Sequence, residues 1–535
     1  MTRIISRVDT NSPAFRKNAD HYRAQTARLH ALRSEQRLGG PKAARDRHHG
    51  RGKMLARERV EYLLDPGTPF LEFGELAGLG KYDGVPPGAG LITGIGVVSG
   101  RHVMVIAHDA TVKGGTYFGM TAKKHVRAQR IAWNNRLPVI TLVDSGGANL
   151  PEQAYIFPDE GQFGSIFHQQ VGMSGDGLPQ IAVVMGPSTA GGAYIPALCD
   201  EVVIVRGQGF MYLGGPELTY AATNERVDAE TLGGGKMHSS VSGVTDHLAE
   251  NDAHALAITR EIVAHLGEPL KLRKTALAPR PPLHATEEIY GVISSDPKVP
   301  TDNREVLARL LDDSEWHEFK PLFGETLMTG WALIHGHEVG VLANNGVLFA
   351  ESAIKATHFI SLCVQRDIPL LFLVDVNGFM VGREAEQGGI SKAGAKMITA
   401  MSSARVPKFT VITGGAYGAG YLAMLGRPFQ PDAMFLWPSG RAALMGPEQA
   451  ASVLSQVRAQ IREREGKPWT AEEEEAFKAP IRKQYETFQD PYNFASNLWA
   501  DGIIDPTETR EVMALLLDLG GRRPKVDTRF GVFRF

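Results

Sequence analysis

The stretch RERVEYLLDPGTPFLEFGELAG, residues 57–78, returns later in the chain as REVLARLLDDSEWHEFKPLFG, residues 304–324. Four collinear matches of this kind predict two copies of one fold, because solenoid repeats have periods of only ~20–50 residues. A chain of 535 residues also exceeds the size at which single cores stop growing, about 250–300 residues. The other three blocks recur in the same order: SGRHVMVIAHD (99–109) as HGHEVGVLANN (335–345), RLPVITLVDSGGA (136–148) as DIPLLFLVDVNGF (367–379), and LGGPE (213–217) as LMGPE (444–448).

The composition is that of an ordinary globular protein, and it excludes several function classes. Hydrophobic residues make up 43% and charged residues 22% of the chain, and the formal net charge is -2. This balance provides no electrostatic field for nucleic acid or for an anionic membrane. The two cysteines, Cys199 and Cys363, cannot build a disulfide framework or a zinc ribbon, so we expect a reducing compartment.

The N-terminal sequence has no apolar core of signal-peptide length, and no run approaches the ~20 apolar residues that span a bilayer. We therefore expect a cytoplasmic protein, or one of the mitochondrial matrix if its source is eukaryotic, with no membrane and no nucleic acid among its partners.

Strands and helices alternate in each half, so the expected fold class is α/β. Residues 267–300 carry six prolines and are expected to link the two halves. We expect domains at 22–278 and 281–527, a helical lead-in over 15–62 and a charged helical hairpin over 461–486. The expected strands include 138–144 and 181–186 in the first half and 369–375 and 409–413 in the second.

Several known catalytic motifs do not occur, and this narrows the mechanism. There is no HExxH zinc motif, and the stretch 186–190, Gly-Pro-Ser-Thr-Ala, lacks the last glycine of a serine-hydrolase elbow. The stretch 233–237 resembles a P-loop, but Met237 replaces the required Ser or Thr. Lys396 lies in only part of a biotin attachment signal, so we do not expect biotin there, and we expect no metal.

Two glycine-rich turns, one in each repeat, are the best candidates for chemistry. Ala190-Gly191-Gly192-Ala193 and Gly418-Ala419-Gly420 each follow an expected strand and precede an apolar helix. Such a turn can direct backbone N–H groups into a pocket at a helix N-terminus, where they stabilise a developing oxyanion. A single glycine-rich turn of this kind is explained by tight packing between a strand and a helix. Because the pattern occurs at matching places in both repeats, we favour a pair of oxyanion holes.

Motifs along essentially the whole chain resemble the carboxyltransferase β subunit of biotin-dependent acyl-CoA carboxylases. The resemblance is strongest to the 3-methylcrotonyl-CoA and geranyl-CoA carboxylase branch, partly because Asn377 stands where the propionyl-CoA branch usually has proline. It implies that each half is a crotonase-like ββα superhelix, giving two tandem domains. The motifs are DATVKGGTY (109–117), LVDSGGANLP (142–151), FPDE (157–160), STAGGAY (188–194), NNGVLFAESA (344–353), NGFMVG (377–382), GGAYGAG (414–420) and MGPEQAA (445–451).

The resemblance also implies roles for individual residues. Gly191 and Gly192 would hold the thioester oxygen of an acyl-CoA as its enolate forms, and Ala419 and Gly420 would hold the ureido oxygen of biotin. The cofactor would supply the base, and the protein would supply orientation and electrostatics. The remaining substrate-binding candidates are Ala190, Ala193, Lys113, Gly114, Gly115, Phe118, Gly146 and Gly147, and the remaining cofactor-binding candidates are Gly378, Phe379, Gly418 and Tyr421.

The same resemblance implies a partner, an α subunit that carries biotin carboxylase and the biotin carboxyl carrier, because neither an ATP site nor a biotin motif is found in this chain. It also implies a β-subunit homo-hexamer, a trimer of dimers, within an α6β6 holoenzyme. Geranyl-CoA, propionyl-CoA and longer acyl-CoA esters remain alternative substrates, since Phe118-Gly119-Met120 and Tyr421-Leu422-Ala423-Met424 depart from the methylcrotonyl pattern. Alternative functions are a CoA-ester decarboxylase subunit, a crotonase-type hydratase or isomerase, and a noncatalytic scaffold.

A few charged and aromatic residues have more than one interpretation. Lys113 and Lys355 are candidates for contacts with phosphates or with a carboxylate. The basic run 42–59 is a candidate for contacts with CoA phosphates, although a solvated helix face is the favoured interpretation. The histidines His108, His125 and His358 are expected to be structural, and Asp144 and Asp375 are expected to cap the turns that follow their strands.

Overall fold

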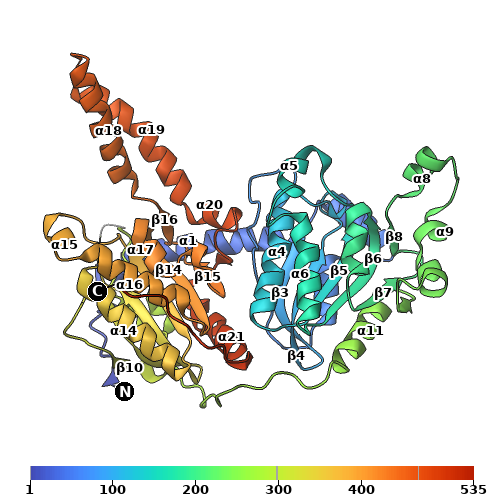
Figure 1. Cartoon of the computed structure of the whole chain (residues 1–535), viewed down its shortest axis with the longest axis horizontal. Helices are drawn as coiled ribbons and strands as arrows, with labels where there is room; N and C mark the ends of the chain where they lie inside the picture. Colours follow the sequence, from blue (N-terminus) through green and yellow to red (C-terminus); the bar gives the residue numbers. More distant parts are fainter. Residues whose placement is uncertain (1, 297–298, 300, 468, 535) are drawn as a thin grey trace. The chain divides into compact units, whose positions relative to one another are not determined.

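Two sheets, one for each repeat, form the frame of the structure (Figure 1). The structure is a computed structural model that describes residues 2–296, 299, 301–467 and 469–534. It divides into two units. The first-repeat unit comprises His30–Lys271 with Ser496–Leu498, and the second-repeat unit comprises the chain up to Leu29, Leu272–Ala495 and the chain from Trp499 onward.

The N-terminal segment belongs to the second-repeat unit. The Asn18 side-chain amide donates to the carbonyl oxygen of Gly291 at 3.3 Å, and the Tyr22 hydroxyl donates to that of Ser294 at 3.3 Å. The expected domain limits, 22–278 and 281–527, do not join the N-terminal segment to the second domain. These limits stay a prediction. The helical lead-in is confirmed as three helices, α1 (Pro13–Leu38), α2 (Lys42–Gly50) and α3 (Ala56–Leu63).

The sheet of the first-repeat unit has the order β2-β3-β4-β5-β6-β7-β9, with β8 paired to β6. Strands β3 and β4 are antiparallel, and β4 to β7 run parallel. Successive side chains of a strand point to opposite faces. Val105 and Val183 therefore join a core with α3 and α11, whereas Val143 and Val184 join another with α4 and α6. The strands are β2 (Leu71–Glu72), β3 (Leu91–Val98), β4 (Arg101–His108), β5 (Val139–Ser145), β6 (Gln180–Thr189), β7 (Glu201–Val205), β8 (Phe210–Tyr212) and β9 (His247–Ala249). The helices are α4 (Gly119–Asn134), α5 (Gln153–Ile156), α6 (Phe163–Gly175), α7 (Tyr194–Ala197), α8 (Pro216–Thr223), α9 (Ala229–Gly233), α10 (Gly235–Met237) and α11 (Asp252–Ala264).

The second-repeat unit repeats this topology in the order β1-β10-β11-β12-β13-β14-β15-β17, with β16 paired to β14. Leu342 and Phe372 pack in one core with α14 and α16. The strands are β1 (Thr2–Arg3), β10 (Glu315–Glu318), β11 (Leu327–Ile334), β12 (His337–Asn344), β13 (Leu370–Val376), β14 (Lys408–Tyr417), β15 (Ala433–Leu436), β16 (Arg441–Ala443) and β17 (Gly502–Ile503). The remaining helices are α12 (Ile289–Val292), α13 (Asn303–Leu307), α14 (Ala350–Arg366), α15 (Arg383–Gln387), α16 (Ile390–Ser403), α17 (Gly418–Ala423), α18 (Pro447–Arg464), α19 (Ala471–Gln489), α20 (Pro491–Ser496) and α21 (Thr509–Arg522).

The two sheets share their irregularities as well as their order. The register between β5 and β6 shifts between Val143 and Ser145, and that between β13 and β14 shifts between Val374 and Val376. An isolated parallel bridge follows in each repeat, between Tyr117 and Ala148 in one and between Leu348 and Phe379 in the other. The predicted duplication of one α/β fold is therefore confirmed, and the equivalent loops at the ends of the strands can be compared position by position.

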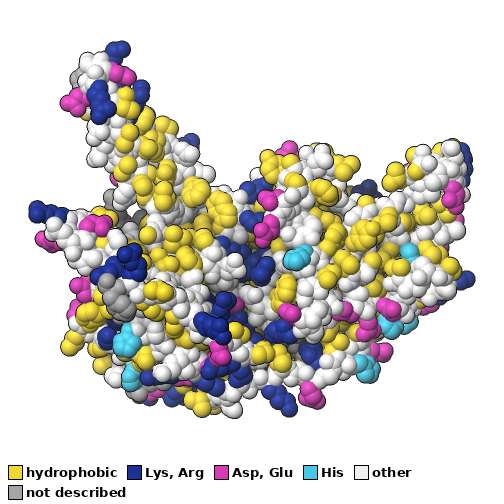
Figure 2. Space-filling model, in the orientation of Figure 1, with side chains coloured by type: hydrophobic (Ala, Val, Ile, Leu, Met, Phe, Trp, Pro, Cys, Tyr) yellow, Lys and Arg dark blue, Asp and Glu magenta, His cyan; other side chains and the backbone are white. Residues whose placement is uncertain are grey.

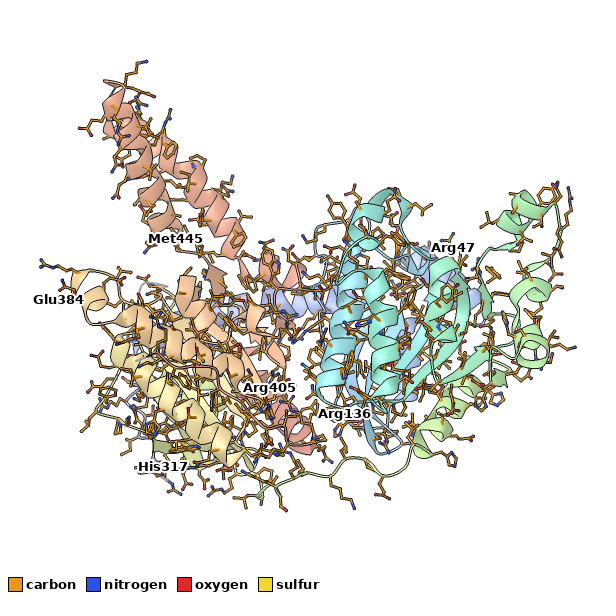
Figure 3. The ribbon with its side chains drawn as sticks, viewed as in Figure 1. Arg47, Arg136, His317, Glu384, Arg405 and Met445 are labelled. Atoms are coloured by element: carbon orange, nitrogen blue, oxygen red, sulfur yellow. The ribbon has the colours of Figure 1, made fainter. Side chains whose placement is uncertain are left out.

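The predicted helical hairpin is confirmed, but it is longer than 461–486 because it includes all of α18 and α19. Figure 1 shows it projecting from the body of the second-repeat unit, and Figure 3 labels Met445 at its foot. Figure 2 shows hydrophobic side chains along the hairpin, and its exposed apolar residues include Val453, Leu454, Val457 and Ile461. Within the described residues, no helix combines the length and the apolar character needed to cross a membrane.

Candidate active site

The first glycine-rich turn lies where β6 ends and α7 begins. Ala190 has a φ of 55°, in the left-handed region, and a 3₁₀ turn over Ala190–Ala193 leads into α7. A Cβ on Gly191 would lie 3.2 Å from a ring carbon of Phe163, whereas for Gly192 the nearest atom is Ser188 Oγ at 3.9 Å. The first N–H groups of a helix lack carbonyl partners within it, and they carry partial positive charge. The turn thus presents backbone donors at the start of a helix, and a methyl group at the buried Gly192 would make only an ordinary contact with Ser188.

The second turn has the same backbone shape. Gly418 has a φ of 54° and begins α17, at the point that matches Ala190 in the first repeat. Ala419 is exposed and Gly420 is buried. A Cβ on Gly420 would lie 2.8 Å from the Cα of Gly378, so this turn is closed against the loop that follows β13.

The loop after β5 brings several of the expected substrate-binding residues together. Gly146 N–H donates to the carbonyl of Gly114 at 2.9 Å, and a Cβ on Gly115 would clash with the carbonyl oxygen of Asp144. Gly147 has a φ of 86°, and its carbonyl accepts from Tyr117 N–H at 2.8 Å. The segment 113–115 and the Gly146-Gly147 pair therefore form one tied structure next to β6.

The side chains of this segment point in different directions. Lys113 is exposed, and its Nζ lies 3.3 Å from where a Cβ on Gly84 would be, so the side chain lies along a glycine-rich loop. Phe118 is buried and packs against Tyr82 with ring centroids 4.7 Å apart. Gly119, at the start of α4, lies against Tyr155 of α5, which leaves room there for no more than a small side chain.

Two of the expected cofactor-binding side chains face inward in the second-repeat unit. The Phe379 ring packs against Gly394 of α16. The Tyr421 ring packs on Phe494, and its hydroxyl oxygen accepts from the backbone N–H of Arg427 at 2.8 Å. Burial raises the pKa of the Tyr421 hydroxyl. Both rings therefore pack into the second-repeat unit, while the backbone of Gly378 lies against Gly420 of the turn.

An apolar hollow of about 730 Å³ lies next to the first turn. It borders the turn because Ala193 and Tyr194 follow Gly192 directly in the chain. An apolar hollow beside a few polar groups is the usual form of a small-ligand site, and here it suits an acyl chain next to a polarised carbonyl. The residues that line it include Ala193, Tyr194, Ala197, Met211, Leu213 and Leu218.

A buried chain of three polar side chains lies under the loop after β5, and the sequence did not reveal it. The Tyr117 hydroxyl lies 2.6 Å from Nε2 of His108 and 2.9 Å from Nδ1 of His125, and Nδ1 of His108 lies 3.1 Å from the carbonyl oxygen of Leu142. Burial lowers the pKa of His108 to about 4 and that of His125 well below its ordinary value. Both rings are therefore neutral at physiological pH. These contacts agree with the prediction that His108 and His125 are structural.

The carboxylates at the ends of the equivalent strands have different surroundings. Asp144 accepts hydrogen bonds from Lys53 at 2.5 Å and from Arg59 at 3.0 Å, all three side chains being buried. Asp375 accepts from the backbone N–H of Gly415 at 2.9 Å, and burial raises its pKa. Part of the basic run 42–59 therefore forms an internal ion cluster, so Lys53 and Arg59 are not available to a ligand.

Lys355 was another candidate for contact with a ligand. It is fully buried in α14, and its Nζ has no hydrogen-bond partner among the described residues. The equivalent Lys124 is also buried and donates to the carbonyls of Gly88 and Leu91. Lys355 is thus a core residue rather than a contact for a phosphate in solution. Among the residues that the structure describes, no group of three or more His, Cys, Asp or Glu side chains is arranged to hold a metal ion.

Comparisons with known proteins identify the family of the chain. The family model for the carboxyl transferase domain matches residues 47–529. The chain is 54% identical over 527 residues to the biotin-dependent 3-methylcrotonyl-coenzyme A carboxylase beta1 subunit of Mycobacterium tuberculosis, covering 98% of each chain. It is 50% identical over 533 residues to the mitochondrial methylcrotonoyl-CoA carboxylase beta chain of Arabidopsis thaliana, covering 98% of this chain and 91% of the relative. The crystal structure of the P. aeruginosa geranyl-CoA carboxylase beta subunit matches with a TM-score of 0.89 and 40% identity over 100% of both chains.

Proposed function

The chain belongs to the carboxyl transferase domain family, and we propose that it is the carboxyltransferase subunit of a biotin-dependent acyl-CoA carboxylase. The observation that carries this proposal is the identity of 54% along 98% of the chain to the beta1 subunit of a biotin-dependent 3-methylcrotonyl-coenzyme A carboxylase. The predicted family and the crotonase-like fold are thereby confirmed. The paired turns at Gly191 and Ala419 supply the chemical reason, since each presents backbone donors at the start of a helix.

The first-repeat turn would bind the acyl-CoA. Gly191 and Gly192 would donate N–H groups to the thioester oxygen, from the turn that leads into α7. As negative charge develops there, donors fixed in advance stabilise it without reorganisation. The hollow bordered by Tyr194 would take the acyl chain and exclude water from it.

The second-repeat turn would bind biotin through Ala419 and Gly420. The exposure of Ala419 and the N-terminal end of α17 fit a small polar carbonyl group of this kind. When bound, biotin supplies the carboxyl group to be transferred and the base for the substrate. The residues of this chain then act by orientation. The contact of Gly420 with Gly378 fixes the turn, and the inward-facing Tyr421 supports it.

The proposed substrate is 3-methylcrotonyl-CoA, because the relatives with identities of 54% and 50% carry that name. Geranyl-CoA is the second candidate. The structural match to a geranyl-CoA carboxylase subunit favours it, and Gly119 at the start of α4 is one of the positions where the chain departs from the methylcrotonyl pattern.

The proposed partner is a biotinylated α subunit, and the proposed assembly is a β-subunit hexamer within an α6β6 holoenzyme. Exposed apolar side chains support an assembly, because patches of this kind usually mark protein interfaces. They occur along the hairpin, as at Val457, and around the hollow, as at Leu218. The proposed location is the cytoplasm, or the mitochondrial matrix in a eukaryote.

The test is ATP-dependent fixation of bicarbonate by this protein together with a biotin-carrying partner, across acetyl-, propionyl-, 3-methylcrotonyl-, geranyl- and longer acyl-CoA esters. Selective turnover of 3-methylcrotonyl-CoA supports the full proposal, and selective turnover of geranyl-CoA supports the second candidate. No turnover of any ester, with CoA esters still bound, contradicts the carboxylase and favours a CoA-ester decarboxylase.

A further inference from the structure

Tyr117 connects two loops that meet at the first turn. Its N–H donates to the carbonyl of Gly147 at 2.8 Å, and its own carbonyl accepts from Asn149 N–H at 2.8 Å. These two bonds fix the loop after β5. That loop in turn lies close to the end of β6, since a Cβ on Gly147 would be 3.7 Å from the carbonyl oxygen of Thr189.

The ring of Tyr117 reaches the turn itself. It meets the ring of Phe163 edge-on, with centroids 4.9 Å apart and planes at 89°, a favoured geometry for aromatic pairs. Phe163 is the side chain that lies against Gly191. A change in the position of the Tyr117 ring would therefore be transmitted through one buried aromatic contact to the backbone donors of the turn.

The hydroxyl of Tyr117 is held from both sides, and its proton can be placed. His108 Nδ1 faces the carbonyl oxygen of Leu142 and must carry a proton to bond it. In the neutral ring His108 Nε2 is then an acceptor, so Tyr117 donates to it. The Tyr117 oxygen accepts from Nδ1–H of His125. All three side chains are buried, with exposures of 0 to 1%.

The second repeat provides an internal comparison. The residues at the positions of His108, Tyr117 and His125 are Asn344, Leu348 and Ala356. The backbone bonds survive there, because Leu348 N–H donates to Gly378 at 3.0 Å and Met380 N–H donates to Leu348 at 2.8 Å. The fold therefore does not require the tyrosine and the two histidines. This set of three side chains lies under the turn that would bind the thioester, and its equivalents in the second repeat are one amide and two apolar side chains.

We propose that Tyr117 is a positioning residue for carboxyl transfer, which holds the loop after β5 and the turn at Gly191 in one geometry and is itself held by His108 and His125. This inference rests on the proposed function of the first turn. The three side chains need not touch the substrate. They act on it only through the placement of backbone donors, where displacements of about 1 Å can cost about 10²-fold in rate.

The test is Tyr117→Phe in the complex with the biotin-carrying partner, compared with Tyr290→Phe. Tyr290 is a matched control because its hydroxyl donates to Asp505 at 2.6 Å in the second-repeat unit. We expect Tyr117→Phe to lower kcat by roughly 10- to 100-fold with KM for the CoA ester changed less than about threefold. Tyr290→Phe should leave both constants unchanged. An unchanged kcat in Tyr117→Phe, or an equal loss in both variants, overturns the proposal.

Hydrogen exchange of the protein without substrate separates this inference from the proposed function. Tyr117→Phe should speed exchange at the amides of Tyr117 and Asn149, whether or not any ester is carboxylated, and unchanged exchange overturns the inference. If Tyr117→Phe does not fold, His108→Asn introduces the residue found at position 344 and loosens the same hydroxyl. We expect it to lower kcat severalfold, and a wild-type kcat contradicts the proposal.

Discussion

Gly420→Ala tests whether the second turn is fixed by its contact with the loop after β13. The new Cβ would lie 2.8 Å from the Cα of Gly378 and 3.2 Å from its N, whereas ordinary contact begins at 3.4 Å. The turn or the loop must therefore move by more than about half an ångström, and both partners are backbone. Overpacking of this kind costs about 1–3 kcal/mol, and the displacement should lower carboxyl transfer by roughly 10- to 100-fold.

The matched control is Gly192→Ala, at the same position of the first turn. Its Cβ meets no atom nearer than Ser188 Oγ at 3.9 Å, so the free energy of unfolding should change by less than about 1 kcal/mol. The assay combines thermal unfolding with bicarbonate fixation at saturating CoA ester and calorimetric binding of that ester. Gly420→Ala should bind the ester normally and transfer the carboxyl group poorly. Wild-type transfer in Gly420→Ala, or equal destabilisation by the two variants, refutes the steric reasoning.

Three further predictions concern stability. Ala190→Gly should leave the free energy of unfolding unchanged or raise it by up to about 1 kcal/mol, because the left-handed φ of 55° strains alanine. Gly418→Ala should lower the free energy of unfolding for the same reason, and chemical denaturation of both variants checks the two signs. His108 has a lowered pKa of about 4, so the unfolded state takes up a proton first. The free energy of unfolding should therefore fall by about 3 kcal/mol between pH 6.5 and pH 4, and by less in His108→Asn. Thermal unfolding measured over this pH range checks this, and a free energy that does not change with pH contradicts it. Asp144→Asn leaves the buried Lys53 without its carboxylate and removes one of the two carboxylates that pair with Arg59, so it should cost about 3–5 kcal/mol in urea unfolding. Asp375→Asn should cost only about 1 kcal/mol, and equal costs for the two variants would contradict the assignment.

The local features of this fold could be predicted because each depends on residues that are close together in the chain. The strand 138–144 and the turn at Gly191 were both visible as an apolar run followed by glycines, and the duplication showed that the same pattern recurs at Ala419. The charged residues of the hairpin predicted its helices, but the predicted start at residue 461 was too late, since the first helix begins at Pro447. The part that was missed carries exposed apolar side chains such as Val453 and Val457 instead of a run of charges.

The side-chain networks could not be predicted, because their members are distant in the chain. Arg59 reaches Asp144 across 85 residues and Asp252 across 193 residues. Before the fold is known, nothing in a basic run distinguishes a cation that is buried from one that meets a phosphate. The same limit applies to Tyr421, whose sequence position next to the turn pointed to a ligand contact, while its ring packs inward on Phe494.

The differences between the repeats carry more functional information than their similarities. Both turns need a left-handed residue before their donors, so Ala190 and Gly418 share a backbone shape that any site of this design requires. The first turn leaves room for a methyl group at Gly192 and rests on a buried aromatic and imidazole cluster. A methyl group at Gly420 of the second turn would instead meet the backbone of Gly378 and the side chain of Val376. An enolate must be stabilised as it forms, which demands donors held to a fraction of an ångström. The ureido oxygen would also gain negative charge when biotin acts as the base, so the second turn would need fixed donors as well. The two repeats would therefore meet one demand in two ways, the first turn through the buried Tyr117 cluster and the second through the close contact of Gly420 with Gly378.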